Sequence, residues 1–376
     1  MNMKTMLKTS VAAAALFAVA APVSAADDTL SSGQPKVKLQ IYGKINKAMM
    51  WADDGVTSRA MAVDNDISGS RFGFIASAPV NEMVSFGAKM EYEFQSNGSN
   101  NMTLHTGAGD TGQGQTNFSE RVAEVTVTHK TLGKLSLGQG PTASDGTAEV
   151  DLSGTSIASN SVSFNGIGGG IQFRNERTRA VLVSNGSVFT NIDGLSRNDR
   201  IRYDSPTFAG FSLATSAVSG GMGDAALTYA GQWGRIKAAA AFGYWNDSGN
   251  STTTKGGMDG SVSLLDASGL SLTLAAGKRD NKSSNVNPDP DFKWGKLGYT
   301  AKIFGAGGTS FGIDYGKFED FNGRATDGKS YGLSAVQNFK DIGADAYILY
   351  RNFSYDAQGT TADDIKVIMT GLQVQF

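Results

Sequence analysis

The chain has 376 residues, 48 glycines, only 7 prolines, no cysteine and a formal net charge of −2. Disulfides and cysteine metal sites are therefore excluded, and a mildly acidic chain without a basic tail is a poor partner for nucleic acid. No stretch beyond residue 25 approaches about 18 consecutive apolar residues, which argues against membrane-spanning helices.

The first 25 residues have the features of a secretory signal peptide. Two lysines precede an apolar run at 11–21, and the tripeptide VSA at 23–25 has the small-x-small pattern that signal peptidase reads. The run is shorter than the roughly 20 residues that a spanning helix needs. We expect residues 1–25 to be removed during export to the periplasm, which leaves 26–376 as the folded chain.

Alternation of apolar and polar residues dominates the rest of the chain. In KVKLQIYGKI, residues 36–45, apolar side chains occupy every second position, and SFGAKMEYEFQ (85–95) and LSLTLAAG (270–277) repeat the pattern. This period of two is typical of β-strands. About sixteen strands are predicted, at 37–50, 67–78, 84–95, 121–129, 134–139, 199–205, 210–218, 225–233, 236–245, 257–266, 270–279, 293–303, 308–317, 329–339, 343–353 and 364–376.

Short and long connections alternate between these segments, and no proline falls inside a predicted strand. A soluble β-sandwich or propeller would need an apolar inner face, but one face of each strand is rich in glycine, serine and charge. We therefore predict an all-β fold, a transmembrane antiparallel barrel with lipid outside and water inside. The last strand must pair with the first, which explains why the chain ends on an amphipathic strand closed by Phe376.

Several segments together resemble the general porins of Gram-negative bacteria. These are, in chain order, IYGKI, SGSRFGFIA, KMEYEFQ, ERVAEVTV with GKLSLGQG, and IRYDSPTFAGFSL. The resemblance covers residues 36–376. It implies a homotrimer in the outer membrane, in contact with lipid and lipopolysaccharide, and it implies that Phe376 is the assembly signal read by the barrel-assembly machinery.

In that family a row of cations on the barrel wall lines the constriction of the pore. By resemblance, Lys44, Arg71 and Arg121 match the wall cations and Glu91 matches an acidic neighbour. Strand alternation places Lys44, Arg71 and Glu91 on the inner face. The same alternation places Arg121 toward lipid and favours Glu124 as the inward residue of that strand. Arg121 would point inward only if the strand begins at a bulge or a loop edge.

The third loop of the family folds inward and narrows the pore, and here it corresponds to residues 140–198. It lacks the Pro-Glu-Phe-Gly-Gly-Asp tip of enterobacterial members and contains an additional possible hairpin, IQFRN with RAVLV. Which loop acid reaches the constriction stays open. The candidates from the loop, and the two arginines that alternate with apolar residues after it, are Asp145, Glu149, Asp151, Arg200 and Arg202.

The predicted function is passive diffusion of ions and small hydrophilic solutes through a water-filled channel. The alternatives are a substrate-selective channel for a sugar or an anion, and a structural barrel if the third loop fills the interior. No enzyme, cofactor or metal site is expected, because only His105 and His129 are available and they are predicted at opposite ends of the barrel. The match to G-x-G-x-x-G at 107–112 lies in a polar loop and lacks the strand and helix of a dinucleotide site.

Overall fold

The chain forms a closed antiparallel β-barrel of sixteen spanning strands, as the sequence predicts. The computed structural model describes residues 30–31, 36–105, 117–161, 163–283 and 288–376. The predicted signal peptide (1–25) and the glycine motif at 107–112 lie outside these residues. Within the described part of the chain, no helix has the length and apolarity required to cross a membrane.

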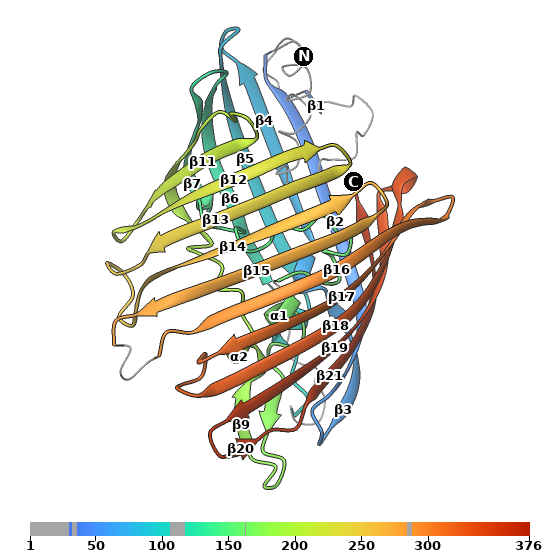
Figure 1. Cartoon of the computed structure of the whole chain (residues 1–376). Helices are drawn as coiled ribbons and strands as arrows, with labels where there is room; N and C mark the ends of the chain where they lie inside the picture. The colour runs from blue at the N-terminus through green and yellow to red at the C-terminus, as the bar shows by residue number, and fades with distance from the viewer. Residues whose placement is uncertain (1–29, 32–35, 106–116, 162, 284–287) are drawn as a thin grey trace.

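Neighbouring strands pair in chain order, and β2 pairs with β21 to close the ring (Figure 1). β3 and β4 both pair with β2 and form one interrupted spanning strand. The strands are β2 (Lys38–Asp53), β3 (Ser58–Asp64) with β4 (Arg71–Pro79), β5 (Val84–Gln95), β6 (Asn117–His129), β7 (Gly133–Pro141), β10 (Arg197–Asp204), β11 (Phe211–Val218), β12 (Met222–Trp233), β13 (Ile236–Asn246), β14 (Thr254–Asp266), β15 (Leu270–Asn281), β16 (Asp291–Phe304), β17 (Gly307–Glu319), β18 (Thr326–Phe339), β19 (Ala344–Ala357) and β21 (Ile365–Gln375).

The outer face of the barrel is apolar and exposed. On β21, Ile368, Leu372 and Val374 are exposed, whereas the intervening Val367 and Met369 are fully buried. The same alternation of exposed and buried residues runs along the other long strands. Exposure of so many large apolar side chains would be costly in water, so this surface suits a bilayer.

The final residue completes the seam of the barrel. The backbone N–H of Phe376 donates to the carbonyl of Gly43 at 3.0 Å, and the N–H of Gly43 donates back to Phe376 at 2.8 Å. The Phe376 ring lies over Gly43, where an added Cβ would come within 2.8 Å of it. Gly43 is therefore the residue that lets the terminal ring pack flat against β2.

The second spanning strand differs from the prediction. Pairing with β2 begins at Ser58 rather than at residue 67, because residues 58–64 form β3 and the connection before it is only 54–57. The strand then breaks at a short 3₁₀ turn, Asp66–Ser68, in which the Asn65 side chain accepts the N–H of Ile67 at 3.0 Å. An asparagine that caps its own turn in this way competes with strand pairing.

Residues 142–196, called here the interior segment, connect β7 and β10 and pack against the polar faces of other strands. The N–H groups of Val150 and Leu152 donate to the hydroxyls of Ser261 and Ser263 on β14, each at 2.9 Å. Figure 1 shows its two short helices enclosed by the ring of strands. Its elements are α1 (Ser163–Gly166), β8 (Gln172–Arg174), β9 (Val181–Ser184) and α2 (Asn185–Val188); β8 and β9 form the hairpin that the sequence indicates.

A buried apolar core lies inside the barrel, between the interior segment and the wall. Phe189 packs edge to face against Phe318 of β17 and Phe353 of β19, with ring centroids 4.8 and 4.9 Å apart, and Phe164 meets Phe318 at 4.7 Å. All four rings are at most 1% exposed. The expectation that the inner face meets only water is therefore wrong for this sector, where inward apolar side chains are covered by the interior segment.

Candidate functional site

A cluster of charged side chains surrounds Glu91 on the inner face of β5. Its carboxylate accepts hydrogen bonds from the Tyr42 hydroxyl at 2.7 Å and from Arg121 Nε at 2.9 Å. Arg71 lies 3.5 Å and Lys89 3.6 Å from the same carboxylate. One buried acid thus holds three cations on the wall, and together with Lys44 these side chains are called here the wall cluster.

Arg121 reaches the wall cluster through a β-bulge. Glu91 pairs with Val122, but the next residue of β5, Tyr92, pairs with Glu120, so Arg121 is the extra residue on β6. A bulge shifts the alternation of side chains on one strand by one position. Arg121 therefore points inward, although the alternation of Val125 and Val127 alone would direct it toward lipid.

The break in the second strand positions the other two cations. The Lys44 ammonium donates to the hydroxyl of Ser68 in the 3₁₀ turn. Arg71, the first residue of β4, donates from Nε to the carbonyl of Gly69 at 3.1 Å. The turn therefore supplies acceptors that fix Lys44 and Arg71 beside Glu91, a function of residues 65–70 that strand alternation does not reveal.

Two of the predicted loop acids, Asp145 and Glu149, lie together with a third, Asp193. Asn191 donates to Glu149 at 3.0 Å and the N–H of Gly146 donates to Asp193 at 2.7 Å. Burial raises the pKa of Glu149 to about 7, and the carboxylate of Asp145 adds to this shift. Burial, followed by the charge of Glu149, also raises the pKa of Asp193.

The positive charges closest to these acids are arginines. Arg197, at the start of β10, lies 3.8 Å from Asp145. The charges of Arg197 and Arg121 both act to lower the pKa of Glu149, against the larger effect of burial. The loop acids thus share an electrostatic field with the wall cluster, and Arg197 and Asp193 extend the set named from sequence.

Asp151, the third predicted loop acid, pairs with the barrel wall. Asp151 forms an ion pair with Lys296 of β16, whose ammonium also donates to Thr155 at 2.9 Å and to the carbonyl of Ser159 at 2.6 Å. The side chains of Lys296 and Asp151 are only 0% and 2% exposed. Asp151 therefore fixes the interior segment to the wall at β16, where its charge is neutralised.

A second buried ion pair lies beside this contact. Arg351 of β19 binds Asp314 of β17 through two hydrogen bonds of 2.9 Å, and Asp314 also accepts from Ser159 at 2.6 Å and from Trp294 at 3.1 Å. Lys296, Asp314 and Arg351 carry no motif in the sequence. Their inward position could have been derived from strand alternation, but their contact with the interior segment could not.

Arg200 and Arg202 of β10 hold the root of the interior segment. Arg200 forms an ion pair with Glu124 and donates to the carbonyls of Pro141 at 3.0 Å and Gly138 at 2.6 Å. Arg202 donates to the carbonyl of Thr142 at 2.6 Å and to Asp204 at 2.7 and 3.0 Å. Both arginines donate to backbone carbonyls at or near the start of the segment, Arg200 from Nε and Nη1 and Arg202 from Nη1.

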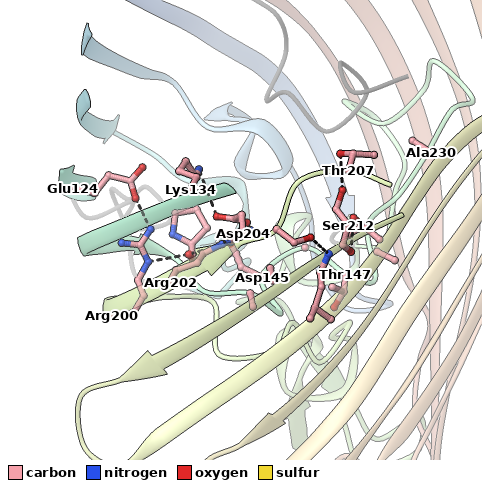
Figure 2. Close-up of a pocket in the computed structure, with 18 of the residues that line it drawn as sticks. Glu124, Lys134, Asp145, Thr147, Arg200, Arg202, Asp204, Thr207, Ser212 and Ala230 are labelled. Atoms are coloured by element: carbon pink, nitrogen blue, oxygen red, sulfur yellow. Dashed lines mark hydrogen bonds and ion pairs between the residues drawn. The ribbon is translucent and has the colours of Figure 1, made fainter. Parts of the chain in front are cut away.

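A cavity of about 580 Å³ is lined in part by these arginines and lies between the root of the interior segment and the wall from β5 to β13. Figure 2 shows Lys134, Asp204, Ser212 and Asp145 facing it from different elements. Within the described part of the chain, no group of three or more histidine, aspartate or glutamate side chains is arranged to hold a metal ion.

A closed sixteen-stranded barrel with an apolar outer face and a charged interior defines a barrel-type channel of the outer membrane. The sequence profile of the Gram-negative porins matches residues 11–358, and the chain belongs to this family. Family membership assigns it to the outer membrane as a channel for passive diffusion. No curated protein sequence matches the chain.

Solved porin structures share the fold at low sequence identity. OmpT of Vibrio cholerae without loop L8 superposes with a TM-score of 0.58 at 16% identity, covering 91% of this chain and 100% of that one. An anion-selective porin from Comamonas acidovorans gives 0.58 at 14% identity, with 90% and 100% coverage. OmpF of Salmonella typhi in complex with daunomycin gives 0.55 at 14% identity, with 91% and 98% coverage.

Proposed function

We propose that the protein is a general porin, a water-filled channel through which ions and small hydrophilic solutes diffuse passively, and that the wall cluster and the loop acids form its constriction. The observation that carries this proposal is that Lys44, Arg71 and Arg121 gather around Glu91 on the inner wall while Asp145 and Glu149 lie together on the interior segment. The charge of Arg121 acts to lower the pKa of Glu149, so the two sets lie within electrostatic range of each other.

Acids opposite bases across a narrow passage set up a field perpendicular to the direction of permeation. Such a field orders water and orients dipolar solutes. An apolar solute must displace the ordered water, which costs free energy. Passage through the constriction then depends on the size, charge and dipole of the solute. The interior segment narrows the passage in this proposal, because it is fixed to the wall at β14, β16 and β17.

The proposed assembly is a homotrimer in contact with outer-membrane lipid and lipopolysaccharide. In support, OmpT of Vibrio cholerae, a structural neighbour at 16% identity, is described in a trimer form. The cleaved signal peptide (1–25), delivery through the periplasm and recognition of Phe376 by the barrel-assembly machinery belong to the same proposal. In support of a role for Phe376 in assembly, its backbone exchanges two hydrogen bonds with Gly43 of β2.

An enzymatic role is not proposed, because the two histidines are placed apart. His105 Nε2 lies 2.5 Å from Asp54 Oδ2 at the mouth near the β8–β9 hairpin, and Arg174 of that hairpin donates to the same carboxylate at 3.1 Å. His129 ends β6 at the opposite rim and accepts the N–H of Thr131 at 3.2 Å. His129 also lies 3.3 Å from the Thr131 hydroxyl in the same exposed turn, and within the described residues no hydrogen bond or ion pair joins either histidine to the wall cluster.

Conductance of the purified protein in planar bilayers tests the proposal. Insertion in steps of three equal openings with weak ion preference is the expected result. Block by a single solute at submicromolar concentration would instead support a substrate-selective channel. Insertion without current, verified by protein in the membrane, would show that the interior segment closes the barrel and would overturn the proposal.

A further inference from the structure

The 580 Å³ cavity at the root of the interior segment contains two lysines, of which Lys89 also belongs to the wall cluster. Lys89 of β5 and Lys134 of β7 both line it, together with Arg200 and Arg202. Three acids share the wall of the cavity, Glu124, Asp145 and Asp204, so four positive and three negative charges leave one positive charge in excess. The distribution of hydrogen bonds shows where that excess lies.

The acids of the cavity lie closer to arginines than to the lysines, although Asp204 Oδ2 is buried without a hydrogen bond. Asp204 accepts two hydrogen bonds from Arg202, at 2.7 and 3.0 Å, whereas its other oxygen lies 3.7 Å from Lys134 Nζ. Glu124 is paired with Arg200, and Arg197 lies beside Asp145. Each acid of the cavity thus has an arginine as its closest cation.

The ammonium groups of Lys89 and Lys134 are therefore left with few acceptors among the described residues. Lys89 Nζ lies 3.6 Å from Glu91, which is already hydrogen-bonded to Tyr42 and Arg121. Within the described residues, neither Lys89 nor Lys134 forms a hydrogen bond, and their side chains are 21% and 42% exposed. A lysine ammonium is a compact, strongly hydrated point charge with three donors, so two of them in one cavity attract an anion.

The remaining wall of the cavity combines hydroxyls with small apolar groups. Ser212 and Thr207 are hydrogen-bonded to each other at 2.8 Å, and the inward Ala214, Ala230 and Ala241 are at most 7% exposed (Figure 2). An inorganic anion would make no use of the alanine surface, whereas a short hydrocarbon chain would bury against it. Small apolar walls with a few placed charges are typical of sites for small organic ligands.

We propose that this cavity is a binding site for small organic carboxylates, with Lys89 and Lys134 as its cations and the alanine surface of β11–β13 as the contact for the hydrocarbon part. The inference rests on the proposed channel function, and it adds a saturable anion site on the side of the constriction where the strands are joined by short turns. Carboxylates then cross by occupying the site, whereas chloride, which has no apolar part, crosses without being retained.

Single-channel conductance in potassium butyrate tests this site. The wild-type conductance should saturate as the butyrate concentration rises, and the double variant K89Q/K134Q should remove the saturation and lower the butyrate-to-potassium permeability ratio by about tenfold. K89R/K134R keeps both charges and should retain the preference for butyrate over potassium. K329Q removes a lysine from the exposed outer face of β18 and should behave as the wild type.

The outcomes separate this inference from the channel function. A wild-type protein that inserts but carries no current overturns the proposed function itself. A wild-type channel whose conductance is linear in butyrate, or a K89Q/K134Q channel that saturates like the wild type, overturns the carboxylate site and leaves the channel intact. Equal loss of current in K329Q would show that the lysine variants act through assembly, which would also overturn the inference.

Discussion

Replacement of Lys296 by methionine should detach the interior segment from the barrel wall. Methionine keeps the length and apolar bulk of the side chain but cannot pair with Asp151 or donate to Thr155 and Ser159. The Asp151 carboxylate, 2% exposed, would then remain buried without a cation. Residues 151–159 are the part of the interior segment that this single ammonium holds.

The size of the destabilisation follows from the burial of the Lys296–Asp151 ion pair. Removing one partner of a buried ion pair costs about 3–5 kcal/mol, because the other charge is left uncompensated. At about 1.4 kcal/mol per factor of ten, the open form of the segment should become about 10²–10⁴ times more populated. The double variant D151N/K296M removes both charges and should recover most of this loss.

Hydrogen–deuterium exchange of the assembled protein in detergent measures the opening directly. Amides at 151–159 should exchange faster in K296M by the factor above, while the strand amides keep their protection. Lys293 on the same strand is the matched control, because its side chain is 66% exposed and its pairs with Asp291 and Glu319 lie at the rim. Unchanged exchange at 151–159 in a folded K296M barrel would refute the anchoring role of Lys296.

Four further predictions concern the constriction, the interior segment and the seam. Arg71→Ala should raise the preference for cations, and an unchanged reversal potential in a salt gradient would remove Arg71 from the constriction. The pKa of about 7 predicts that Glu149 loses its proton near neutral pH, so cation preference should rise between about pH 6 and 8 in the wild type but not in Glu149→Gln. Because the folded chain holds this proton more tightly than the unfolded chain, packing of the segment should weaken as pH rises from 4.5 through 7, which the exchange rates would detect. Gly43→Val should lower the yield of heat-modifiable barrel, because its side chain meets the Phe376 ring, whereas Gly305→Val, which meets no atom within 4 Å, tests for a general effect of added bulk.

The fold could be predicted almost entirely because it depends on a property that sequence displays directly. In a barrel each strand has one face in lipid and one inside, and a period of two reports this arrangement without knowledge of any partner. β5 was predicted at the bounds that the structure shows, 84–95. The second strand was predicted poorly because Asn65 and the turn after it interrupt pairing, and turn chemistry is not visible in hydrophobic periodicity.

The candidate site could be predicted only in part. The inward direction of Lys44, Arg71 and Glu91 follows from alternation, but the direction of Arg121 depends on one extra residue in β6, which leaves no clear trace in the sequence. The partners of the loop acids depend on how fifty-five residues of irregular chain fold inside the barrel. Contacts between segments more than a hundred residues apart, such as Asp151 with Lys296, require the structure.

The loop acids differ in their partners and in their ionisation, and these differences determine the charge that a permeating ion meets. Asp151 is neutralised by Lys296 at the wall, and partial protonation of Glu149 near neutral pH reduces the negative charge of the segment further. On the opposite side, Arg71 and Arg121 share a single carboxylate, Glu91, with Lys89. A count of acids and bases therefore overstates the negative side of the passage. The sign of its selectivity depends on which carboxylates remain ionised and unpaired, and by that measure we expect the proposed constriction to have a weak preference for anions.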